Sequence, residues 1–428
     1  MATLDPAKEA TTTFLRAQFH RYYESTKPVL PDRFGRREFG FMFWTAGIVQ
    51  RHLGFGKEDE LRDFLASRVP AHAYYSSAYY ETPNAPTMEE KGWLGADLIF
   101  DLDADHLPGA PSMSYHEMLE AIRLKIIKLY DEFLVEDFGV DESNMRIVFS
   151  GGRGYHLHVH DPRVLTLGSH ERREVVDWIF GTDFDMRSAF KEKVFDTKQF
   201  KTYVQSKKKI IIERADLRTG WPRKIIRGLL GLADLLEPMD RQMAVNFLAS
   251  IPSVKRAEAD NLWENLFKPR GSRGLGLRGV DRLRSQREIE VLTDKNVILV
   301  LEILEQLFRT QPDVYQGVSL ERIKPFGDTD QPVTSDIKRL IRLPSSLHGK
   351  TGLQVVPLSR DAIDDFRPLR DAVPAAWTDD EEHVNLKNKL NMEIRGEVFD
   401  LAAGVNEVPQ YLAIFLAARG LATVIPEA

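Results

Sequence analysis

Two acidic residues on one predicted strand are the first candidates for chemistry. In ADLIFDLD, residues 96–103, the side chains alternate with period two, which predicts a buried strand with Asp101 and Asp103 on one face. Their backbones lie roughly 7 Å apart, so the two carboxylates can flex inward and ligate a pair of Mg²⁺ or Mn²⁺ ions. A strand that simply ends in solvent is the alternative. Repelling charges beside apolar residues, without a visible neutralising partner, favour metal binding.

A glycine-rich turn follows the next predicted strand, in SGGRGYH at residues 150–156. Its glycines let backbone N–H groups approach a phosphate, Ser150 offers a hydroxyl, Arg153 supplies a fixed charge and His156 could donate to a phosphate oxygen. An ordinary turn between strands explains the same residues. The turn closes a strand–helix–strand unit that begins at the Asp pair, and this position favours an anion cradle next to the acidic strand.

A third cluster surrounds Asp330 in DQPVTSDIKRLIRLPSSLHGKTG. This carboxylate is followed by basic residues and then by a loop that contains serine, glycine and histidine. The alternative is a helix cap followed by a solvated basic face. Because the two upstream motifs need a third metal ligand and further phosphate contacts, we prefer the functional interpretation. The polar residues of the cluster are Lys338, Arg339, Arg342, His348 and Lys350.

The elements that must position these residues form a sheet with helices packed against it. The pattern predicts a helix and then a strand beginning near Arg37, and HAYYSSAYY also has the composition of sheet. A capping box at Ser114 and Glu117 predicts the helix that follows the acidic strand. Beyond Pro162 the pattern is mainly helical, with a terminal helix beginning about Pro409.

Two segments in this second part are strongly basic, residues 198–227 and 268–287, and could bind a phosphate backbone. The stretch GLGLRG at residues 274–279 satisfies the dinucleotide-binding pattern. It follows KPRGSR rather than an apolar strand, so we interpret it as a basic loop.

Composition excludes several classes of chemistry. With no cysteine, the chain cannot use disulfides, thiolate nucleophiles, cysteine-ligated zinc or an iron–sulfur cluster on its own cysteines. The 58 Lys and Arg against 64 Asp and Glu give a net charge of −6, which argues against a uniformly basic coat. We find neither a secretory signal nor a membrane-spanning stretch, and expect a cytoplasmic protein without membrane contact.

Four blocks in this order resemble the catalytic small subunit of archaeal and eukaryotic DNA primases: REFGFMFW, DLIFDLDAD, VFSGGRGYHLHV and DQPVTSDIKRLIRLPSSLHGKTGL. The resemblance implies a primase fold of the α/β (α+β) class, with a mixed sheet, an RRM-like half, flanking helices and a helical insertion. Residues 1–357 would form the catalytic domain, interrupted by the insertion at about 228–290. Residues 358–428 would form an acidic linker and a C-terminal helical extension.

The resemblance also assigns roles to individual residues. It places divalent metals on Asp101, Asp103 and Asp330. Gly152 departs from members that have a second arginine there, and the zinc site that many members build from cysteines cannot be carried over. It further implies a heterodimer with a large primase subunit that carries an iron–sulfur cluster. The implied triphosphate contacts are Ser150, Arg153 and His156, with Arg342 and His348 as further candidates.

The leading hypothesis is therefore a nucleotidyltransferase that synthesises short primers on single-stranded DNA from nucleoside triphosphates during DNA replication. LIFDLDAD also resembles the opening strand of haloacid-dehalogenase-type phosphatases, although about 100 residues precede it here and SGGRGYH has no place in that scheme. A non-catalytic nucleic-acid-binding subunit is the remaining alternative. The intact trio of aspartates argues against it, because a site freed from catalysis has no reason to keep costly like charges together.

Overall fold

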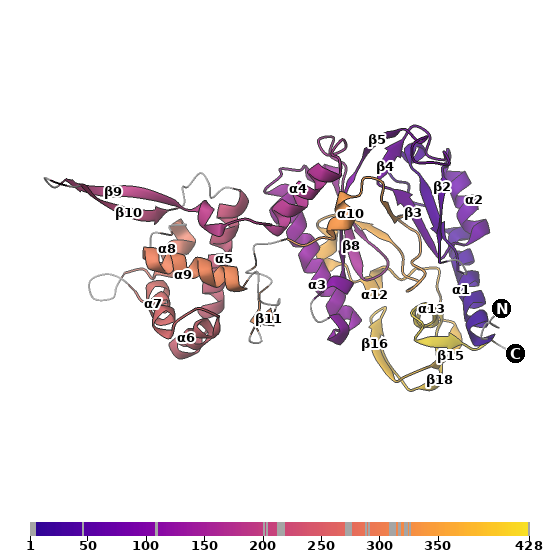
Figure 1. Cartoon of the computed structure of the whole chain (residues 1–428). Coiled ribbons are helices and arrows are strands. Elements are labelled where there is room, and N and C mark those ends of the chain that lie inside the picture. The colour runs from indigo at the N-terminus through magenta and orange to yellow at the C-terminus, as the bar shows by residue number, and fades with distance from the viewer. Residues whose placement is uncertain are drawn as a thin grey trace. The chain divides into compact units, whose positions relative to one another are not determined.

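The chain forms two compact units (Figure 1). The first consists of Met1–Asp131, Val140–Asp177 and Asp328–Ala428, and the second of Glu132–Gly139 and Trp178–Gly327. The coordinates are a computed structural model. They describe residues 6–426 except 45–46, 108–109, 200–201, 203, 212–218, 270–275, 287–288, 290–291, 308–313, 316–317, 321–323 and 325–326.

Two four-stranded sheets, in which all neighbouring strands are antiparallel, form the centre of the first unit. One has the order β13-β3-β1-β2 and the other the order β14-β7-β8-β6. The strands of the first sheet are β1 (Phe39–Met42), β2 (Val49–Leu53), β3 (His72–Ser76) and β13 (Leu340–Arg342). Those of the second are β6 (Leu98–Asp103), β7 (Met145–Phe149), β8 (Gly154–Val159) and β14 (Val356–Leu358). A further pair joins β4 (Ala78–Tyr80) to β5 (Trp93–Ala96). The expected mixture of helices and sheet is confirmed.

The strand–helix–strand unit that begins at the acidic strand is also confirmed. Ser114 and Glu117 form the predicted capping box at the start of α3 (Tyr115–Lys128), whose apolar residues pack on β6 and β8. A π-helical turn continues it over Leu129–Val135. Because β8 pairs antiparallel with both β6 and β7, it lies between the two parallel strands that the helix connects. The glycine-rich turn therefore comes next to the acidic strand, as the sequence predicts.

A buried ion pair ties the acidic strand to the first sheet. Arg37, just before β1, and Asp97, just before β6, both have fully buried side chains, and their charged groups lie 2.6 Å apart. Arg37 also donates to the carbonyl oxygens of Ser76 and Ser77 at 2.9 and 2.7 Å. The start of β6 is thus anchored by charge-assisted hydrogen bonds in a dry environment.

Helices flank these sheets. The helix predicted before the first strand is α1 (Pro6–Ser25), and it packs against α2 (Glu58–Arg68). The remaining helices of the first unit include α10 (Gln331–Ser335), α11 (Ala362–Asp365) and α12 (Pro368–Asp371), while α4 (Ser169–Phe180) crosses the boundary between the two units. No helix in the described ranges combines the length and hydrophobicity needed to span a bilayer.

The part after residue 357 corrects the expectation of an acidic linker and a helical extension. The predicted terminal helix is present, but strands surround it, and the acidic residues 381–382 begin a strand whose exposed and buried positions alternate. The turn at Arg395 and Gly396, where both residues have positive φ, closes a hairpin that the helical pattern did not reveal. This C-terminal layer contains β15 (Glu381–Leu386), β16 (Leu390–Ile394), β17 (Glu397–Leu401), β18 (Gly404–Pro409), α13 (Gln410–Ala418) and β19 (Ala422–Val424).

The second unit is mainly helical, as expected, and its helices extend beyond both ends of the predicted insertion. The first basic segment begins on a long hairpin, which Figure 1 shows as an extended two-stranded arm, and ends on a helix. Its strands, β9 (Lys191–Gln199) and β10 (Val204–Ile211), correct the helical expectation for this stretch. The helices are α5 (Gly220–Leu236), α6 (Arg241–Ser250), α7 (Arg256–Phe267), α8 (Gly279–Gln286) and α9 (Asp294–Glu305), and β11 (Val314–Tyr315) pairs with β12 (Val318–Ser319).

Candidate active site

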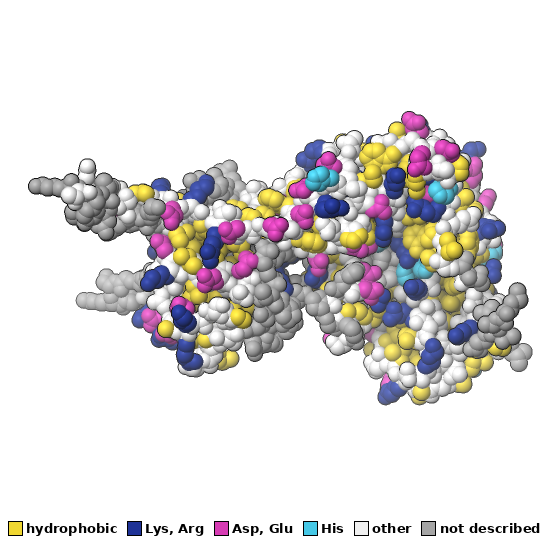
Figure 2. Space-filling model, viewed as in Figure 1, with side chains coloured by type: hydrophobic (Ala, Val, Ile, Leu, Met, Phe, Trp, Pro, Cys, Tyr) yellow, Lys and Arg dark blue, Asp and Glu magenta, His cyan; other side chains and the backbone are white. Residues whose placement is uncertain are grey.

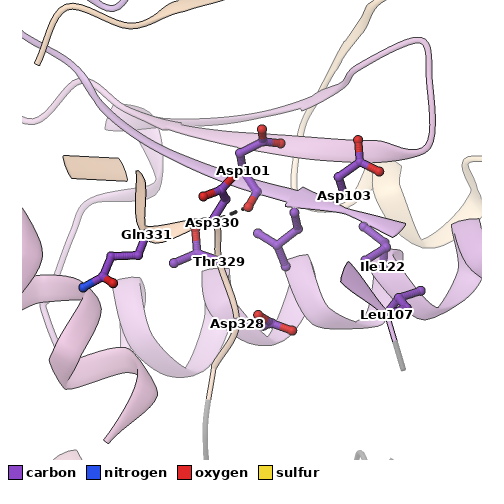
Figure 3. A pocket seen from close by; sticks show the side chains of 9 residues that line it. Asp101, Asp103, Leu107, Ile122, Asp328, Thr329, Asp330 and Gln331 are labelled. Carbon is purple, nitrogen blue, oxygen red and sulfur yellow. Dashed lines mark hydrogen bonds between the residues drawn. The ribbon is translucent and has the colours of Figure 1, made fainter. Parts of the chain in front are cut away.

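The acidic pair lies on β6 as predicted. In the register of the sheet Asp101 is opposite His156 and Asp103 is opposite Gly154, so the end of the acidic strand lies beside the start of β8. Asp101 and Asp103 project from the same side of the strand (Figure 3). The glycine-rich turn and the two carboxylates therefore occupy one end of the sheet.

The segment before α10 brings Asp330 to the same place. The backbone N–H of Asp330 donates to the carbonyl oxygen of Asp101 at 2.8 Å, and the Thr329 hydroxyl donates to the same oxygen at 3.4 Å. Asp330 stands at the N-cap of α10, yet its carboxylate makes no capping hydrogen bond. Figure 3 shows it beside Asp101. Asp101, Asp103 and Asp330 line one cavity of about 220 Å³.

The carboxylates that line this cavity are close enough to affect the pKa of Asp101. Burial raises the pKa of Asp101 to about 7, and the nearby charges of Asp103 and Asp330 contribute to the rise against the opposing effect of two arginines. His156 Nε2 lies 3.5 Å from Asp101 Oδ1, but burial lowers the pKa of His156 to about 3. This imidazole is therefore neutral at pH 7 and does not compensate the negative charge.

A divalent cation fits the chemistry of this donor set. Three carboxylates without a sulfur or imidazole donor are the ligand type of Mg²⁺ and Mn²⁺, and a cation would relieve the like-charge repulsion at Asp101. Within the described part of the chain, no three acidic or histidine side chains converge closely enough to hold a metal ion as they stand. Metal binding has to draw the carboxylates of Asp101, Asp103 and Asp330 together.

A second cavity, of about 340 Å³, shares Asp101 and Asp103 with the first and is otherwise largely basic. All five residues expected to contact a triphosphate line it. It therefore joins an acidic wall to a wall suited to phosphate. The five residues are Ser150, Arg153, His156, Arg342 and His348.

The glycine-rich turn is shaped by contacts with the His348 loop. The Gly152 N–H donates to Ser150 Oγ at 3.2 Å, and the Thr351 hydroxyl donates to the Gly151 carbonyl oxygen. The same hydroxyl lies 3.4 Å from His348 Nδ1. Arg153, at the end of the turn, pairs with Asp105 at 2.5 Å. The turn and the loop thus form one hydrogen-bonded wall of the basic cavity.

Replacing Gly151 by alanine should damage this wall. Gly151 has a φ of +73°, and a Cβ there would lie 2.8 Å from His348 Cβ. Gly139 has a φ of +58° with nothing within 4 Å of such a Cβ. We expect Gly139→Ala to cost about 1 kcal/mol of unfolding free energy for backbone conformation alone. Gly151→Ala should cost more and also raise the KM for nucleoside triphosphate. Denaturant unfolding and steady-state kinetics measure the difference, and equal behaviour of the two variants would contradict the packing described.

Arg342 is held in place by Tyr74. It lies on β13 opposite Tyr74 of β3, and its guanidinium carbon is 4.6 Å from the centre of the Tyr74 ring. Its Nη1 atom is buried and has no hydrogen-bond partner, and the same holds for Nδ1 of His156. Buried polar groups are rarely left unsatisfied in folded proteins. A phosphate oxygen bound in the cavity would supply an acceptor for the Arg342 group.

Four cationic or aromatic residues that had not been assigned a role from sequence also line the basic cavity. Arg339 and Lys350 belong to the third cluster of the sequence, where their charge was the available signal. Tyr74 lies in the aromatic run HAYYSSAYY, and its role became visible only through its pairing with Arg342. Arg419, from the end of α13, had no local signal at all.

Comparison with known proteins identifies the family. Residues 100–360, more than half of the chain, match the family model for the DNA primase small subunit. The chain belongs to the DNA primase small subunit family. It is 39% identical over 428 residues to the DNA primase small subunit PriS of Methanocella arvoryzae, with 98% of this chain and the whole relative covered. It is 38% identical to PriS of Methanosphaerula palustris and 37% identical to PriS of Methanococcoides burtonii, in each case over 97% of this chain and 99% of the relative. The resemblance inferred from the four sequence blocks is confirmed.

Several cations of the two basic segments form ion pairs, which the sequence alone does not indicate. Arg223 and Arg227 both pair with Glu136, at 2.7 and 2.8 Å, and Arg278 and Arg284 both pair with Glu237, at 2.7 and 2.5 Å. Figure 2 shows acidic and basic side chains interspersed on the described surface of the second unit. These cations are thus partly neutralised within their own unit.

Some residues of the basic segments lie outside the described part of the chain. Lys198, on β9, is described and exposed. The residues outside are Lys201, Arg214, Arg218, Arg270, Arg273 and Arg287, together with the side chains of Lys207, Lys208 and Lys209 and the first two residues of the 274–279 loop.

Proposed function

We propose that this chain is the catalytic subunit of a primase, which transfers nucleotidyl groups from nucleoside triphosphates to a growing primer on single-stranded DNA. The observation that carries the proposal is the pair of cavities joined at Asp101 and Asp103. One side offers three carboxylates for divalent metal, and the other offers guanidinium, ammonium and imidazole groups for a triphosphate. Phosphoryl transfer requires both a site for the metal ions and a site for the phosphates.

In the proposed reaction the 3′-oxygen of the primer attacks the α-phosphorus of the incoming nucleotide. The bond from that phosphorus to the bridging oxygen breaks, pyrophosphate leaves, and the proton of the hydroxyl passes to solvent. Asp101, Asp103 and Asp330 would hold Mg²⁺ or Mn²⁺, which lowers the barrier to attack and stabilises the departing charge. Arg153, Arg342 and their neighbours in the basic cavity would orient the triphosphate and balance its charge.

Each basic residue has a part in this scheme that follows from its surroundings. Arg342 is stacked on Tyr74 and presents an unsatisfied buried donor, so it is positioned before substrate arrives. Arg153 is paired with Asp105 and must exchange that carboxylate for a phosphate. His348, whose pKa burial lowers well below its ordinary value, would act as a neutral hydrogen-bonding group.

Membership of the primase family favours this proposal over the two alternatives drawn from sequence. The match to residues 100–360 includes the acidic strand, the glycine-rich turn and the Asp330 segment, so all three motifs fall within the family. Neither a haloacid-dehalogenase-like phosphatase nor a non-catalytic nucleic-acid-binding subunit accounts for that combination. The basic cavity gives the glycine-rich turn a role that the phosphatase scheme lacks.

We also propose that the chain works with a large primase subunit. The name small subunit, carried by its relatives, supports an assembly of unequal chains. A chain without cysteine cannot hold an iron–sulfur cluster on its own thiolates, so a partner would have to carry one. Exposed lysines of the hairpin, such as Lys198, are candidate contacts for the template backbone.

Removal of divalent metal tests the proposed function. After chelation and dialysis, primer synthesis and pyrophosphate release on single-stranded DNA should fall to background and return with Mg²⁺ or Mn²⁺, with the large subunit absent or present. Mn²⁺ should also raise the melting temperature of the wild-type chain but not that of the Asp101→Asn, Asp103→Asn variant, because binding to the folded state stabilises it. Primer synthesis by metal-free protein, or pyrophosphate release that needs no template, would contradict the proposal.

A further inference from the structure

The C-terminal layer contributes a side chain to the basic cavity. Arg419 follows α13, forms the C-cap of that helix, and lines the cavity together with Arg153 and Arg342. It lies outside residues 100–360, the part of the chain that matches the family model. The cavity is thus completed by a segment that lies far along the chain from its other walls.

Tyr115, the first residue of α3, positions Arg419. The Arg419 guanidinium carbon is 5.1 Å from the centre of the Tyr115 ring. Phe415, one helical turn earlier in α13, meets the same ring edge to face at 5.9 Å and 71°. The Tyr115 hydroxyl in turn donates to the carbonyl oxygen of Gly152 in the glycine-rich turn. One tyrosine therefore connects the end of α13 to the phosphate-binding turn.

Among the described residues, the charge of Arg419 is unpaired, in contrast to that of Arg153 in the same cavity. Arg153 pairs with Asp105, and Arg395 of the C-terminal layer pairs with Asp379 at 3.3 Å. Among the described residues no carboxylate forms an ion pair with Arg419, although its partly exposed side chain faces a cavity that already contains other cations. This cavity is lined by more cations than carboxylates, namely Arg153, Arg339, Arg342, Lys350 and Arg419 against Asp101, Asp103 and Asp105. A bound anion would balance this excess of positive charge.

Gly152 has no side chain that could contribute charge to the cavity, and Arg419 contributes charge there instead. This glycine lines the same cavity, and a Cβ at that position would lie 3.1 Å from His348 Nε2. The turn has no side chain at this point, and the N–H and carbonyl of Gly152 are already hydrogen-bonded to Ser150 and Tyr115. A guanidinium from the C-terminal layer supplies positive charge to the cavity that this turn residue cannot.

We propose that Arg419 binds the triphosphate of the incoming nucleotide, held in place by Tyr115, and that the C-terminal layer is thereby part of the substrate site. This inference rests on the proposed function, since it assigns a ligand to one residue of the same cavity. A planar guanidinium can donate two parallel hydrogen bonds to phosphate oxygens, which lysine cannot reproduce.

The test compares three variants of the full chain. Arg419→Ala removes the guanidinium, Arg419→Lys keeps only the charge, and Arg395→Ala is the matched control. Arg395 also lies over a tyrosine ring, that of Tyr411 at 4.8 Å, but it does not line the basic cavity. Titration calorimetry measures binding of inorganic triphosphate and of a nucleoside monophosphate, and steady-state kinetics separate KM from kcat.

We expect Arg419→Ala to weaken triphosphate binding about tenfold or more and to raise the KM for nucleotide by a similar factor, because one charge-assisted contact is lost. Arg419→Lys should recover part of this affinity, and nucleoside monophosphate should bind Arg419→Ala as it binds wild type. Arg395→Ala should match wild type in every measurement. Triphosphate affinity of Arg419→Ala within twofold of wild type, or an equal loss for the monophosphate, would overturn the inference.

A further substitution at position 419 keeps the test decisive if Arg419→Ala lowers the melting temperature. Arg419→Gln keeps a polar stem over Tyr115 without the charge, and its triphosphate affinity should fall as in Arg419→Ala. Unchanged affinity in this variant would overturn the inference. The proposed function has its own separate failure, namely primer synthesis without metal, so a template-dependent enzyme indifferent to Arg419 would refute only the role of Arg419.

Discussion

Replacing Asp101 and Asp103 together by asparagine is expected to reduce primer synthesis about a thousandfold. Metal-ion catalysis supplies several kcal/mol of transition-state stabilisation, and each factor of ten in rate corresponds to about 1.4 kcal/mol. Asparagine has nearly the same shape as aspartate, so the fold should survive. The substitution also removes a carboxyl whose pKa burial, together with the charge of Asp103, raises to about 7, and the variant should therefore be at least as stable as wild type. Primer synthesis on single-stranded DNA and thermal unfolding measure the two effects.

Asp328 provides the matched control for this substitution. It lines the same cavity as Asp101 and Asp103, but its carboxylate pairs with Lys125 at 2.9 Å, and Figure 3 shows it away from the other three aspartates. Pairs of this exposed kind contribute at most about 1 kcal/mol. Asp328→Asn should keep activity within a few-fold of wild type. If Asp328→Asn lost as much activity as the double variant, the cavity as a whole rather than the trio would be responsible.

Replacing Arg37 by methionine is expected to lower the unfolding free energy of the first unit by about 3–5 kcal/mol. The charged groups of Arg37 and Asp97 are fully buried and 2.6 Å apart, so removing the cation leaves an uncompensated carboxylate in the interior. The carbonyl oxygens of Ser76 and Ser77 lose their donors as well. Activity should fall together with stability, because Asp97 directly precedes the strand that carries the proposed catalytic carboxylates.

Arg33 is the control for this effect. It lies over the ring of Tyr79, which Arg37 also contacts, but it is exposed and has no buried carboxylate partner among the described residues. Arg33→Ala should change the unfolding free energy by less than about 1 kcal/mol. Chemical denaturation of the two variants gives the comparison, and a similar loss in both would show that stacking on Tyr79, rather than the buried pair, provides the stabilisation.

The same pair predicts how stability depends on pH. Burial alone would raise the pKa of Asp97, but His160, 3.1 Å away, and the guanidinium of Arg37 outweigh it and lower the pKa to about 2. A carboxyl with a depressed pKa stabilises the fold above its unfolded value near 4 and loses that contribution as the pH falls toward 2. In Arg37→Met the pKa of Asp97 should rise, so this loss should begin at higher pH.

Local patterns in the sequence predicted those parts of the site that depend on neighbouring residues. The alternation in ADLIFDLD placed Asp101 and Asp103 on one face of a strand, and the capping box at Ser114 and Glu117 placed the start of the following helix. A strand–helix–strand unit then brings the glycine-rich turn beside the acidic strand, because such connections are short and follow few topologies. The acidic strand and the glycine-rich turn therefore lie in one region of the fold.

These local patterns could not predict contacts between segments that are distant in the sequence. The link between Thr329 and Asp101 spans 228 residues. Only the need for a third metal ligand and the resemblance to a known family indicated that Asp330 belongs with the acidic pair. No periodicity in the chain relates Arg419 to a turn at Gly152. The pairing of Arg223 and Arg227 with Glu136 likewise depends on tertiary packing, so a basic run in sequence became a partly neutralised surface in the fold.

The hairpins were missed for a different reason. The arm formed by β9 and β10 is rich in lysine, and the C-terminal strands carry many acidic residues, so neither has the clean apolar alternation of a half-buried strand. In both places the backbone pairs with a neighbouring strand, while most of the charged side chains that the structure describes there stay exposed. The sequence signal was strongest where burial is deepest, which explains why α13 was predicted and the strands around it were not.

De novo synthesis on homopolymeric single-stranded DNA tests the central claim most directly, that the carboxylate trio and the basic cavity form one template-directed nucleotidyl-transfer site. Nucleotides labelled at the α-phosphate are supplied one type at a time, with Mg²⁺ or Mn²⁺, to the chain alone and to the chain with the proposed large subunit. The account predicts labelled oligomers only with the nucleotide complementary to the template, one pyrophosphate released per nucleotide added, and none of either with Asp101→Asn, Asp103→Asn. Oligomers of non-complementary nucleotide, or undiminished synthesis by that variant, would contradict it.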